Sequence, residues 1–558
     1  MPEWKLEDLY PSLDAPELDQ DIKKLQSDAK TFHGSYQGKL IDIVDDGAGG
    51  GDLARIIREY EALQDLAGRI GSFAGLLYAG DTSNPDRAKF YGDIQEKLTE
   101  ISSSLLFFSL ELNRLEDSVV DACCVNPDLQ VYRPWIDDLR KEKPYQLEDE
   151  LEQLFHEKSV TSRGAWNRLF NETITSLKFE VGGESLSLEP TLNGLLESDP
   201  EKRRQAAEAL ADVFQSNLRL FTLITNTLAK DKEISDRWRG FGDVADERHL
   251  SNRVEGTVVD ALVRAVAEKY PAIPHRYYAL KARWLGKDKL AHWDRNAPLP
   301  HQSSKVIPWS DAQNIVLDAY SGFDPKMSDI ASEFFKSGWI DAPVRSGKSP
   351  GAFSHPTVPS AHPYILLNYQ GKPRDVMTLA HELGHGVHQV LANEQGALMA
   401  PTPLTLAETA SVFGEMLTFK ELLSRTTNPR ERKALLASKV EDMINTVARQ
   451  IAFYQFERNI HTERRSGELT SEKIGEIWLD VQRESLGPSV RLEAGFETFW
   501  SYIPHFIHSP FYVYAYAFGE CLVNSLYAVY ENADEGFVDK YFSMLKAGGS
   551  KNYHELLH

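Results

Sequence analysis

Residues 381–385, His-Glu-Leu-Gly-His, have the residue types and spacing of a site that could bind a metal ion and activate water. On a helix, His381 and His385 lie one above the other, so both imidazoles can reach one ion at the distance of about 2.0–2.1 Å that zinc requires. Glu382 lies beside them and can reach a water activated by that ion. The alternative is a chance match, which with 16 His in 558 residues would occur in about a few per cent of such chains at most. We therefore predict a metal site here.

The polar face of the surrounding segment, 375–392, indicates a cleft. On a helical projection the apolar residues of this segment form one continuous arc. The opposite arc holds Thr378, His381, Glu382, His385, His388 and Gln389. A helix that faced bulk water would carry Lys, Arg or Asp there, and this face has none beyond Asp375, which we predict as the N-cap. The segment is thus predicted to be one helix that faces a cleft.

A catalytic zinc site needs a third protein ligand and one position open to water. His388 shares the polar face, but its separation from His381 along a helix is about 10 Å, which is too long for one ion. We expect His388 in the pocket wall or behind the ligands.

A better candidate for the third ligand lies on the predicted helix 404–423. This helix is apolar nearly all round except for Glu408 and Glu415, which share a face. Buried carboxylates require a partner, and a metal ion or a metal-bound imidazole supplies one. Two local alternatives remain open, because Thr405 and Glu408 have the spacing of a capping box and Glu415 could form an ordinary buried salt bridge.

The composition excludes several classes of function. A formal net charge of −22 argues against nucleic acid or an anionic membrane as the main partner, since both need a basic surface. The sequence has no apolar leader and no run of about eighteen apolar residues, so we predict neither secretion nor a membrane span. Its three Cys, of which Cys123 and Cys124 are adjacent, form neither a disulfide framework nor a zinc ribbon. We expect a cytoplasmic protein.

Helices that could position these residues are predicted along most of the chain, from apolar residues at three- and four-residue spacing. They cover about 19–154, 199–287 and 404–548, and the last range ends in the aromatic segment 499–530.

A change of pattern marks a boundary between the first two helical regions. Residues 177–188 alternate around Gly182-Gly183, which predicts a β-hairpin with a two-residue turn. We therefore divide the chain into an N-terminal helical domain, 1–190, and a catalytic domain, 191–558, whose core is 350–530.

Strand-like segments lie directly upstream of the metal helix, between residues 338 and 369. They are GWIDAP, PGAFSHPTV and AHPYILLNY. Pro363 in the last segment predicts an edge strand or the start of a strand. An exposed strand edge beside a metal cleft could hold an extended peptide by backbone hydrogen bonds, and the alternative is a small structural sheet.

Several blocks of sequence, in order across residues 350–530, now point to one family. They are GAFSHPTVPS, HPYILLNY, AHELGHGVHQ, LAETASVFGE, IPHF and FYVYAYAFGE, and the chain starts with WKLEDLYPSL at Trp4. Together they resemble the oligoendopeptidase F branch of the thimet-oligopeptidase-like zinc metallopeptidases. The resemblance implies that His381, His385 and Glu408 bind one zinc ion and that Glu382 is the general base.

The resemblance also implies roles for His and Tyr residues late in the chain, which bind the substrate carbonyl and stabilise the oxyanion. We assign His505, Tyr512 and Tyr516 to this catalytic role. We expect four further residues to support the metal ligands or to contact substrate, namely His388, Glu415, His508 and Tyr514. The alternative is that most of the late rings belong to the core or to the cleft wall.

The resemblance finally implies a mainly α, two-lobed helical shell that encloses a deep channel, with a small β-sheet beside the active-site helix. Such a zinc endopeptidase hydrolyses internal bonds of short, unstructured oligopeptides with a metal-activated water. Two other functions fit the same residues: a carboxypeptidase-like zinc hydrolase with another cut position, and a silent, zinc-stabilised peptide-binding protein. Glu382 argues against the second, since a structural site needs no base and closes with four protein ligands.

The C-terminus departs from the family pattern. Family members continue through another segment, so the resemblance predicts that the chain is truncated after KNYHELLH. The terminal HELLH, 554–558, is a second formal H-E-x-x-H. We interpret it as a coincidence, because it lies at a chain end with no third ligand downstream.

Overall fold

The computed structural model describes residues 1–44, 49–300, 306–532 and 536–557. Helices make up most of this part of the chain, and its sheets have two or three strands. The predicted mainly α fold is therefore confirmed. No helix within the described ranges is long and apolar enough to cross a membrane.

The N-terminal region consists of helices that bury one apolar face each. The longest are α1 (Pro16–Tyr36), α3 (Gly50–Gly80) and α4 (Pro85–Ser103). Shorter helices are η1 (Leu6–Asp8), α2 (Leu40–Ile43), α5 (Leu106–Arg114), α6 (Asp117–Cys123), α7 (Pro127–Gln130), α8 (Arg133–Lys141), η3 (Lys143–Tyr145), α9 (Asp149–Lys158) and α10 (Arg163–Ser176). One hydrophobic core, which includes the buried rings of Phe73 and Phe108, joins most of them. The helices predicted over about 19–154 are thus confirmed.

The predicted β-hairpin follows. Strands β1 (Phe179–Val181) and β2 (Glu184–Leu186) pair antiparallel, with Val181 opposite Glu184. Gly182 and Gly183 both have positive φ, 61° and 88°, which a two-residue hairpin turn of this kind requires. The proposed domain boundary near residue 190 stays a prediction.

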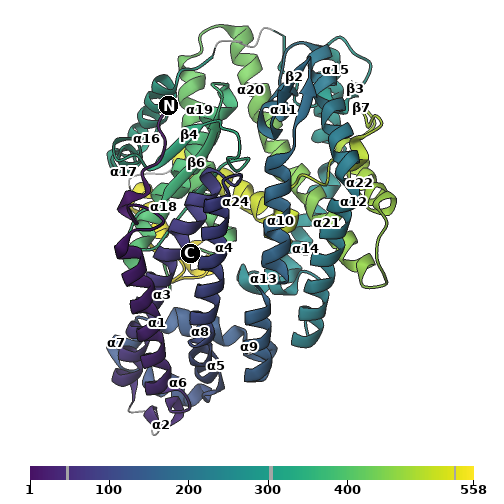
Figure 1. The fold of residues 1–558 in the computed structure, drawn as a ribbon. Coiled ribbons are helices and arrows are strands. Elements are labelled where there is room, and N and C mark those ends of the chain that lie inside the picture. Colours follow the sequence, from purple (N-terminus) through teal and green to yellow (C-terminus); the bar gives the residue numbers. More distant parts are fainter. Residues whose placement is uncertain (45–48, 301–305, 533–535, 558) are drawn as a thin grey trace.

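A second group of helices follows the hairpin, in agreement with the pattern over 199–287. It contains α11 (Leu188–Gly194), α12 (Pro200–Arg239), α13 (Asp246–Ser251), α14 (Gly256–Lys269) and α15 (Pro274–Trp284). Figure 1 shows α1, α3 and α4 in the left half of the molecule and α10, α12 and α14 in the right half. Helices α11, α12 and α14 pack against α21 (Gln450–Arg464) and α22 (Ser471–Leu486) through a second hydrophobic core, and α15 belongs to a smaller one.

A three-stranded sheet lies upstream of the metal helix, as predicted. Its strands β4 (Ile340–Pro343), β5 (Phe353–His355) and β6 (Tyr364–Tyr369) are arranged in the order β4-β6-β5. Strand β4 is parallel to β6 and β5 is antiparallel to it, so β5 forms one edge. Pro363 directly precedes β6, which fits a strand start. Helices α16 (Trp309–Phe323) and α17 (Pro325–Lys336) precede the sheet.

The metal motif lies on α18 (Pro373–Ala392), which packs against α19 (Leu404–Arg425). The prediction that Asp375 is the N-cap is wrong: the N-cap is Lys372, and Pro373 opens the helix. Proline is favoured at that position because its missing N–H would have no partner there. The Asp375 carboxylate instead accepts hydrogen bonds from the backbone N–H of Gln370 and of Lys372.

The C-terminal region is helical in large part. Its elements are η5 (Asn393–Gln395), α20 (Pro429–Ile444), the π-helical turn η6 (Asn445–Arg449), α23 (His505–His508), α24 (Tyr514–Asn532), α25 (Phe537–Lys546) and α26 (Tyr553–Leu557). Smaller elements are β3 (Leu290–Ala291), which pairs with β7 (Val490–Arg491), and the turns η4 (His292–Asp294) and η7 (Phe496–Thr498). The aromatic segment 499–530 is not one helix, because Pro504 and Pro510 interrupt it; Tyr512 lies in the turn before α24.

Candidate metal centre and active site

Two helices bring three potential metal ligands together. His381 and His385 on α18 and Glu408 on α19 each offer a ligand atom, and these atoms all lie within 4.8 Å of one another. The Nε2 atoms of His381 and His385 are 3.3 Å and 3.5 Å from Oε2 of Glu408. In the described part of the chain, no other group of His, Cys, Asp and Glu has such an arrangement.

The chemistry of these three groups fits a zinc ion. Two imidazoles and one carboxylate are a frequent ligand set for catalytic zinc. Burial lowers the pKa of His385 to about 4, which leaves its imidazole neutral, the form that binds metals. Glu408 is fully buried, and a buried carboxylate beside two imidazoles favours a positive charge between them.

Close helix packing fixes the position of Glu408. A Cβ added at Gly384 of α18 would lie 2.5 Å from the carbonyl oxygen of Ala410 on α19, so only glycine allows this approach. A Cβ at Gly519 of α24 would lie 2.4 Å from Cβ of Glu408. Ser411 donates a hydrogen bond to Oε2 of Glu408 over 3.0 Å. The carboxylate is therefore held from two neighbouring helices and from its own.

The capping-box alternative for Glu408 does not hold. Helix α19 begins after Pro403, and the Thr405 hydroxyl donates to the carbonyl oxygen of Asn252 over 3.1 Å. The carboxylate of Glu408 instead accepts from the hydroxyl of Tyr512 over 2.7 Å. Glu408 thus faces His381 and His385 and not the start of its helix.

Glu415 orients His381. Its Oε1 lies 2.6 Å from Nδ1 of His381, and its Oε2 lies 3.8 Å from Nζ of Lys439 on α20. Burial alone would lower the pKa of His381, but hydrogen bonds with Glu408 and Glu415 hold this pKa well above its usual value. A carboxylate on the second ring nitrogen fixes the orientation of a metal-binding imidazole. Glu415 therefore combines this contact with the salt bridge that we considered as its alternative role.

Glu382 follows His381 on α18 and lies near strand β5 of the sheet. Its side chain is buried, with 6% of the residue exposed, and the backbone N–H of Ser354 on β5 acts to lower its pKa. Burial raises the pKa of Glu382 to about 7. A carboxyl group with such a pKa can both accept and return a proton near neutral pH.

The late aromatic block reaches the same site. The hydroxyl of Tyr516 lies 2.9 Å from Nε2 of His505, and the His505 ring stacks at 5.7 Å on Tyr512, which holds Glu408. Burial lowers the pKa of His505 to about 4, so this ring is neutral. Burial raises the pKa of Tyr512 and of Tyr516 above its usual value, so both phenols keep their protons at neutral pH.

Three other predicted site residues contact different parts of the protein. His388 is buried and its Nε2 lies 3.4 Å from the Thr402 hydroxyl. His508 bonds to Asn171 on α10 over 2.8 Å. Tyr514 is fully buried and accepts from the side chain of Asn252 over 2.7 Å.

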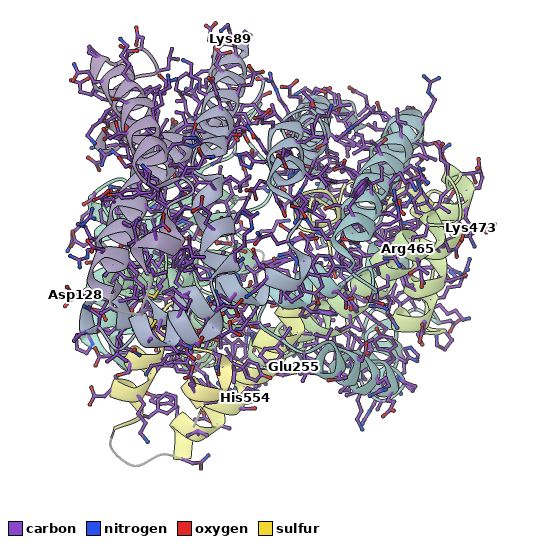
Figure 2. All side chains as sticks on the ribbon, turned by 90° about the horizontal axis from the view of Figure 1, so that it is seen from below. Lys89, Asp128, Glu255, Arg465, Lys473 and His554 are labelled. Atoms are coloured by element: carbon purple, nitrogen blue, oxygen red, sulfur yellow. The ribbon has the colours of Figure 1, made fainter. Side chains whose placement is uncertain are left out.

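The described residues of the second H-E-x-x-H, 554–557, lie in different surroundings. His554 and Glu555 are exposed on α26, and His558 lies outside the described residues. Glu555 accepts from the backbone N–H of Asn552 and so closes the start of its own short helix. Figure 2 shows His554 at the edge of the molecule near Glu255.

A cavity of about 390 Å³ adjoins the candidate active site. Thr378, one turn before His381 on α18, and His505 of the aromatic block both line it. Its wall also includes Gly351 and Ala352, which directly precede β5.

The sequence reasoning missed several of the residues that support the site. Lys439 forms a salt bridge with Glu415, while Ser411 and Gly519 contact Glu408. No sequence motif assigns these roles to the three residues. The only available signal was Gly519 in the block FYVYAYAFGE, where a small residue breaks an aromatic run.

Comparison with known proteins places this geometry in context. Residues 195–558 match peptidase family M3, and residues 111–179 match the family described as oligopeptidase F. The sequence is 28% identical to oligopeptidase PepF of Bacillus subtilis (strain 168), over 98% of this chain and 81% of that protein. It is 25% identical to the chromosomal oligoendopeptidase F of Lactococcus lactis subsp. cremoris, over 95% of this chain and 88% of the relative.

The fold agrees with these sequence matches. The crystal structure of oligoendopeptidase-F from Enterococcus faecium superposes with a TM-score of 0.73 at 23% identity, and the alignment covers 95% of this chain and 91% of that chain.

Proposed function

Because this chain belongs to peptidase family M3, over residues 195–558, we propose that it is a zinc-dependent endopeptidase that hydrolyses internal bonds of short, unstructured oligopeptides. It is a metallopeptidase that cleaves oligopeptides, in keeping with the family and with its relatives. The observation that carries the finer proposal is the convergence of His381, His385 and Glu408, with the carboxylate of Glu382 beside them. The small number of Cys favours a reducing, cytoplasmic setting for this activity.

His381, His385 and Glu408 hold one zinc ion, and Glu415 keeps His381 in the orientation that this requires. When bound, zinc supplies a Lewis acid that polarises a carbonyl and lowers the pKa of water to about 7. Glu382 takes a proton from the attacking water on its carboxylate and passes it to the leaving amine nitrogen. A pKa of about 7 suits both transfers.

Tyr516, His505 and Tyr512 stabilise the charge that develops on the carbonyl oxygen. The phenol of Tyr516 donates a hydrogen bond to it, while neutral His505 positions that phenol through Nε2. Tyr512 keeps Glu408 in place from the same side. His388, His508 and Tyr514 shape the surroundings of the site by their contacts with Thr402, Asn171 and Asn252.

The edge of β5 binds the substrate as an added strand. Strand β5 forms one edge of the sheet, and Ser354 connects it to the general base Glu382. An extended peptide paired with this edge places its backbone carbonyls along the metal site. Only an unstructured peptide can pair in this way, which suits a peptidase of short substrates.

The test uses internally quenched peptides that are blocked at both ends, so that only internal cleavage gives a signal. We expect the wild type to cleave them, to lose activity when zinc is chelated, and to regain it when zinc is restored. Glu382→Gln should retain one zinc equivalent and lose activity. Near-full activity of Glu382→Gln, or a wild type that cleaves no blocked peptide from a diverse library, would refute the proposal.

A further inference from the structure

Three arginines gather in the wall of the 390 Å³ cavity without an anionic partner. Arg295, Arg374 and Arg449 all line it. Within the ranges that the structure describes, none of the three guanidinium groups forms a salt bridge or a hydrogen bond, and Arg449 only packs over the ring of Phe453 at 4.6 Å. Burial, and then the charges of Arg295 and Arg374, lower the pKa of Arg449 to about 10. Arg374 is exposed and the other two are half-buried, and three cations around one cavity favour the binding of an anion.

The carboxylates of the cavity do not supply this anion. Glu189 accepts from the backbone N–H of Gly351 over 2.6 Å, and Asp375 accepts from two backbone N–H groups at the start of α18. Both carboxylates act on Arg374 through space, as does Asp442 of α20 outside the cavity wall. Burial raises the pKa of all three, that of Asp442 to about 7, which weakens their charge. The cavity therefore keeps an excess of positive charge.

The helix that carries Arg449 is irregular at this point. Arg449 ends the π-helical turn η6, which joins α20 to α21 without a break in the chain of helices. Such turns are frequent at functional sites, since the extra residue points side chains in new directions. Here Asn445 at the start of the turn and Gln450 just after it also line the cavity.

Unpaired acceptors lie beside the arginines. The side-chain oxygens of Asn296, Asn445 and Gln450 are buried and have no hydrogen-bond partner among the described residues. All three residues line the same cavity. Buried amide oxygens normally have a donor, and the backbone N–H groups of a bound peptide would supply it. The cavity thus offers cations for a carboxylate together with acceptors for peptide N–H groups.

The cavity also lies where the end of a bound peptide would reach. A peptide that pairs antiparallel with β5 runs toward Ala352 and Gly351, which line the cavity. Arg374 precedes His381 on α18 by about 10 Å along the helix axis. That distance equals roughly three residues of an extended peptide.

We propose that Arg295, Arg374 and Arg449 bind the C-terminal carboxylate of the oligopeptide substrate and thereby fix the cut at a constant short distance from its C-terminus. This inference rests on the proposed peptidase function. A carboxylate could also come from an acidic side chain, and the experiment separates the two sources.

The test compares one peptide in three forms. The first has a free C-terminal carboxylate and the second a C-terminal amide. The third also ends in an amide, but its last residue is Glu, so that its only acid there is the side chain. Wild type should cleave the free acid with a kcat/KM about tenfold or more above that of the amide, because a charge-assisted contact is lost. The amidated peptide that ends in Glu should be cleaved with about the same kcat/KM as the plain amide. When residues are added at the N-terminus of the free acid, mass spectrometry should show the same C-terminal product.

Arg449→Gln and Arg374→Gln should each reduce the preference for the acid to about one, because kcat/KM for the acid falls to the level of that for the amide. Arg483→Gln, which alters an exposed arginine paired with Asp480, is the matched control and should keep the wild-type preference. A variant that still cleaves the amide is folded and active as a peptidase. A loss of its preference for the free acid can therefore be distinguished from a failure of the proposed peptidase function.

The inference is overturned if wild type cleaves acid and amide equally, or if both arginine variants keep the wild-type preference. It is also overturned if the amide after Glu is cleaved as fast as the free acid, because the site would then read an acidic side chain.

Discussion

The same five-residue pattern occurs twice in this chain, in two different environments. On α18, His381 and His385 are partly buried and converge with Glu408, which comes from another helix. On α26, His554 and Glu555 are exposed, and Glu555 caps its own helix of five residues.

The difference shows that the pattern alone does not make a site. On α18, Glu415 holds one imidazole, Tyr512 donates to the carboxylate of Glu408, and burial raises the pKa of Glu382 to about 7. On the exposed helix, the described residues offer His554 no such partner, and its ring lies 4.1 Å from that of Tyr553. The convergence of the three candidate ligands therefore depends on the second helix and on the packing around both.

Substitution of each motif glutamate by glutamine should produce the largest difference in kcat between the two motifs. Glu382→Gln removes the general base, and we expect kcat to fall by about 10²–10⁴-fold with zinc retained. Glu555→Gln removes only a helix cap and should leave kcat unchanged. Steady-state kinetics on one quenched peptide measure both. Equal effects in the two variants would mean that the environment of α18 is not what distinguishes the motifs.

Loss of the Tyr516 hydroxyl should have the next largest effect. Tyr516→Phe keeps the ring against His505 and Tyr512 but removes the donor to the oxyanion, so kcat should fall by about 10²-fold. Tyr553→Phe, beside the exposed motif, is the matched control and should change nothing in catalysis. A Tyr516→Phe enzyme with wild-type kcat would remove the aromatic block from the catalytic account.

Glu415→Gln should weaken metal binding without abolishing it. The amide cannot orient the His381 ring as the carboxylate does, so zinc affinity should fall by about 10–100-fold. Competition with a chelator of known affinity measures this change. The activity should return at high zinc concentration; persistent inactivity in zinc-saturated enzyme would instead give Glu415 a direct part in catalysis.

A glycine substitution tests the packing that holds Glu408. The Cβ of Gly519→Ala would lie 2.4 Å from Cβ of Glu408, and relief of this overlap should cost about 1–3 kcal/mol in the free energy of unfolding and lower zinc affinity. Gly75→Ala on α3 is the control, because its Cβ meets no atom within 4 Å. Thermal unfolding with and without zinc compares the two. A Gly519→Ala protein as stable as Gly75→Ala would contradict the packing argument.

Local patterns predicted a large part of this molecule. The helices, the hairpin turn at Gly182-Gly183 and the strands before α18 all follow from residue periodicity and turn chemistry, which act over a few residues. The ligand candidates His381 and His385 could be predicted from a local pattern as well, because both lie on one helix. The start of α18 was placed wrongly because Asp375 satisfies backbone N–H groups from inside the helix.

Features that depend on distant segments could not be predicted. Lys439 reaches Glu415 from another helix, and the arginines of the cavity come from three separate regions of the chain. No local pattern encodes such convergence, because it arises only when the helices pack. The choice of Glu408 over other acidic residues came from the family resemblance together with the apolar character of its helix.

Zinc content measured in His385→Ala and in His554→Ala tests the central claim most directly. We predict one zinc equivalent in the wild type and in His554→Ala, and loss of bound zinc and of peptidase activity in His385→Ala. If His554→Ala loses zinc while His385→Ala retains it, the ion is not held by α18 and α19, and the account of this active site is wrong.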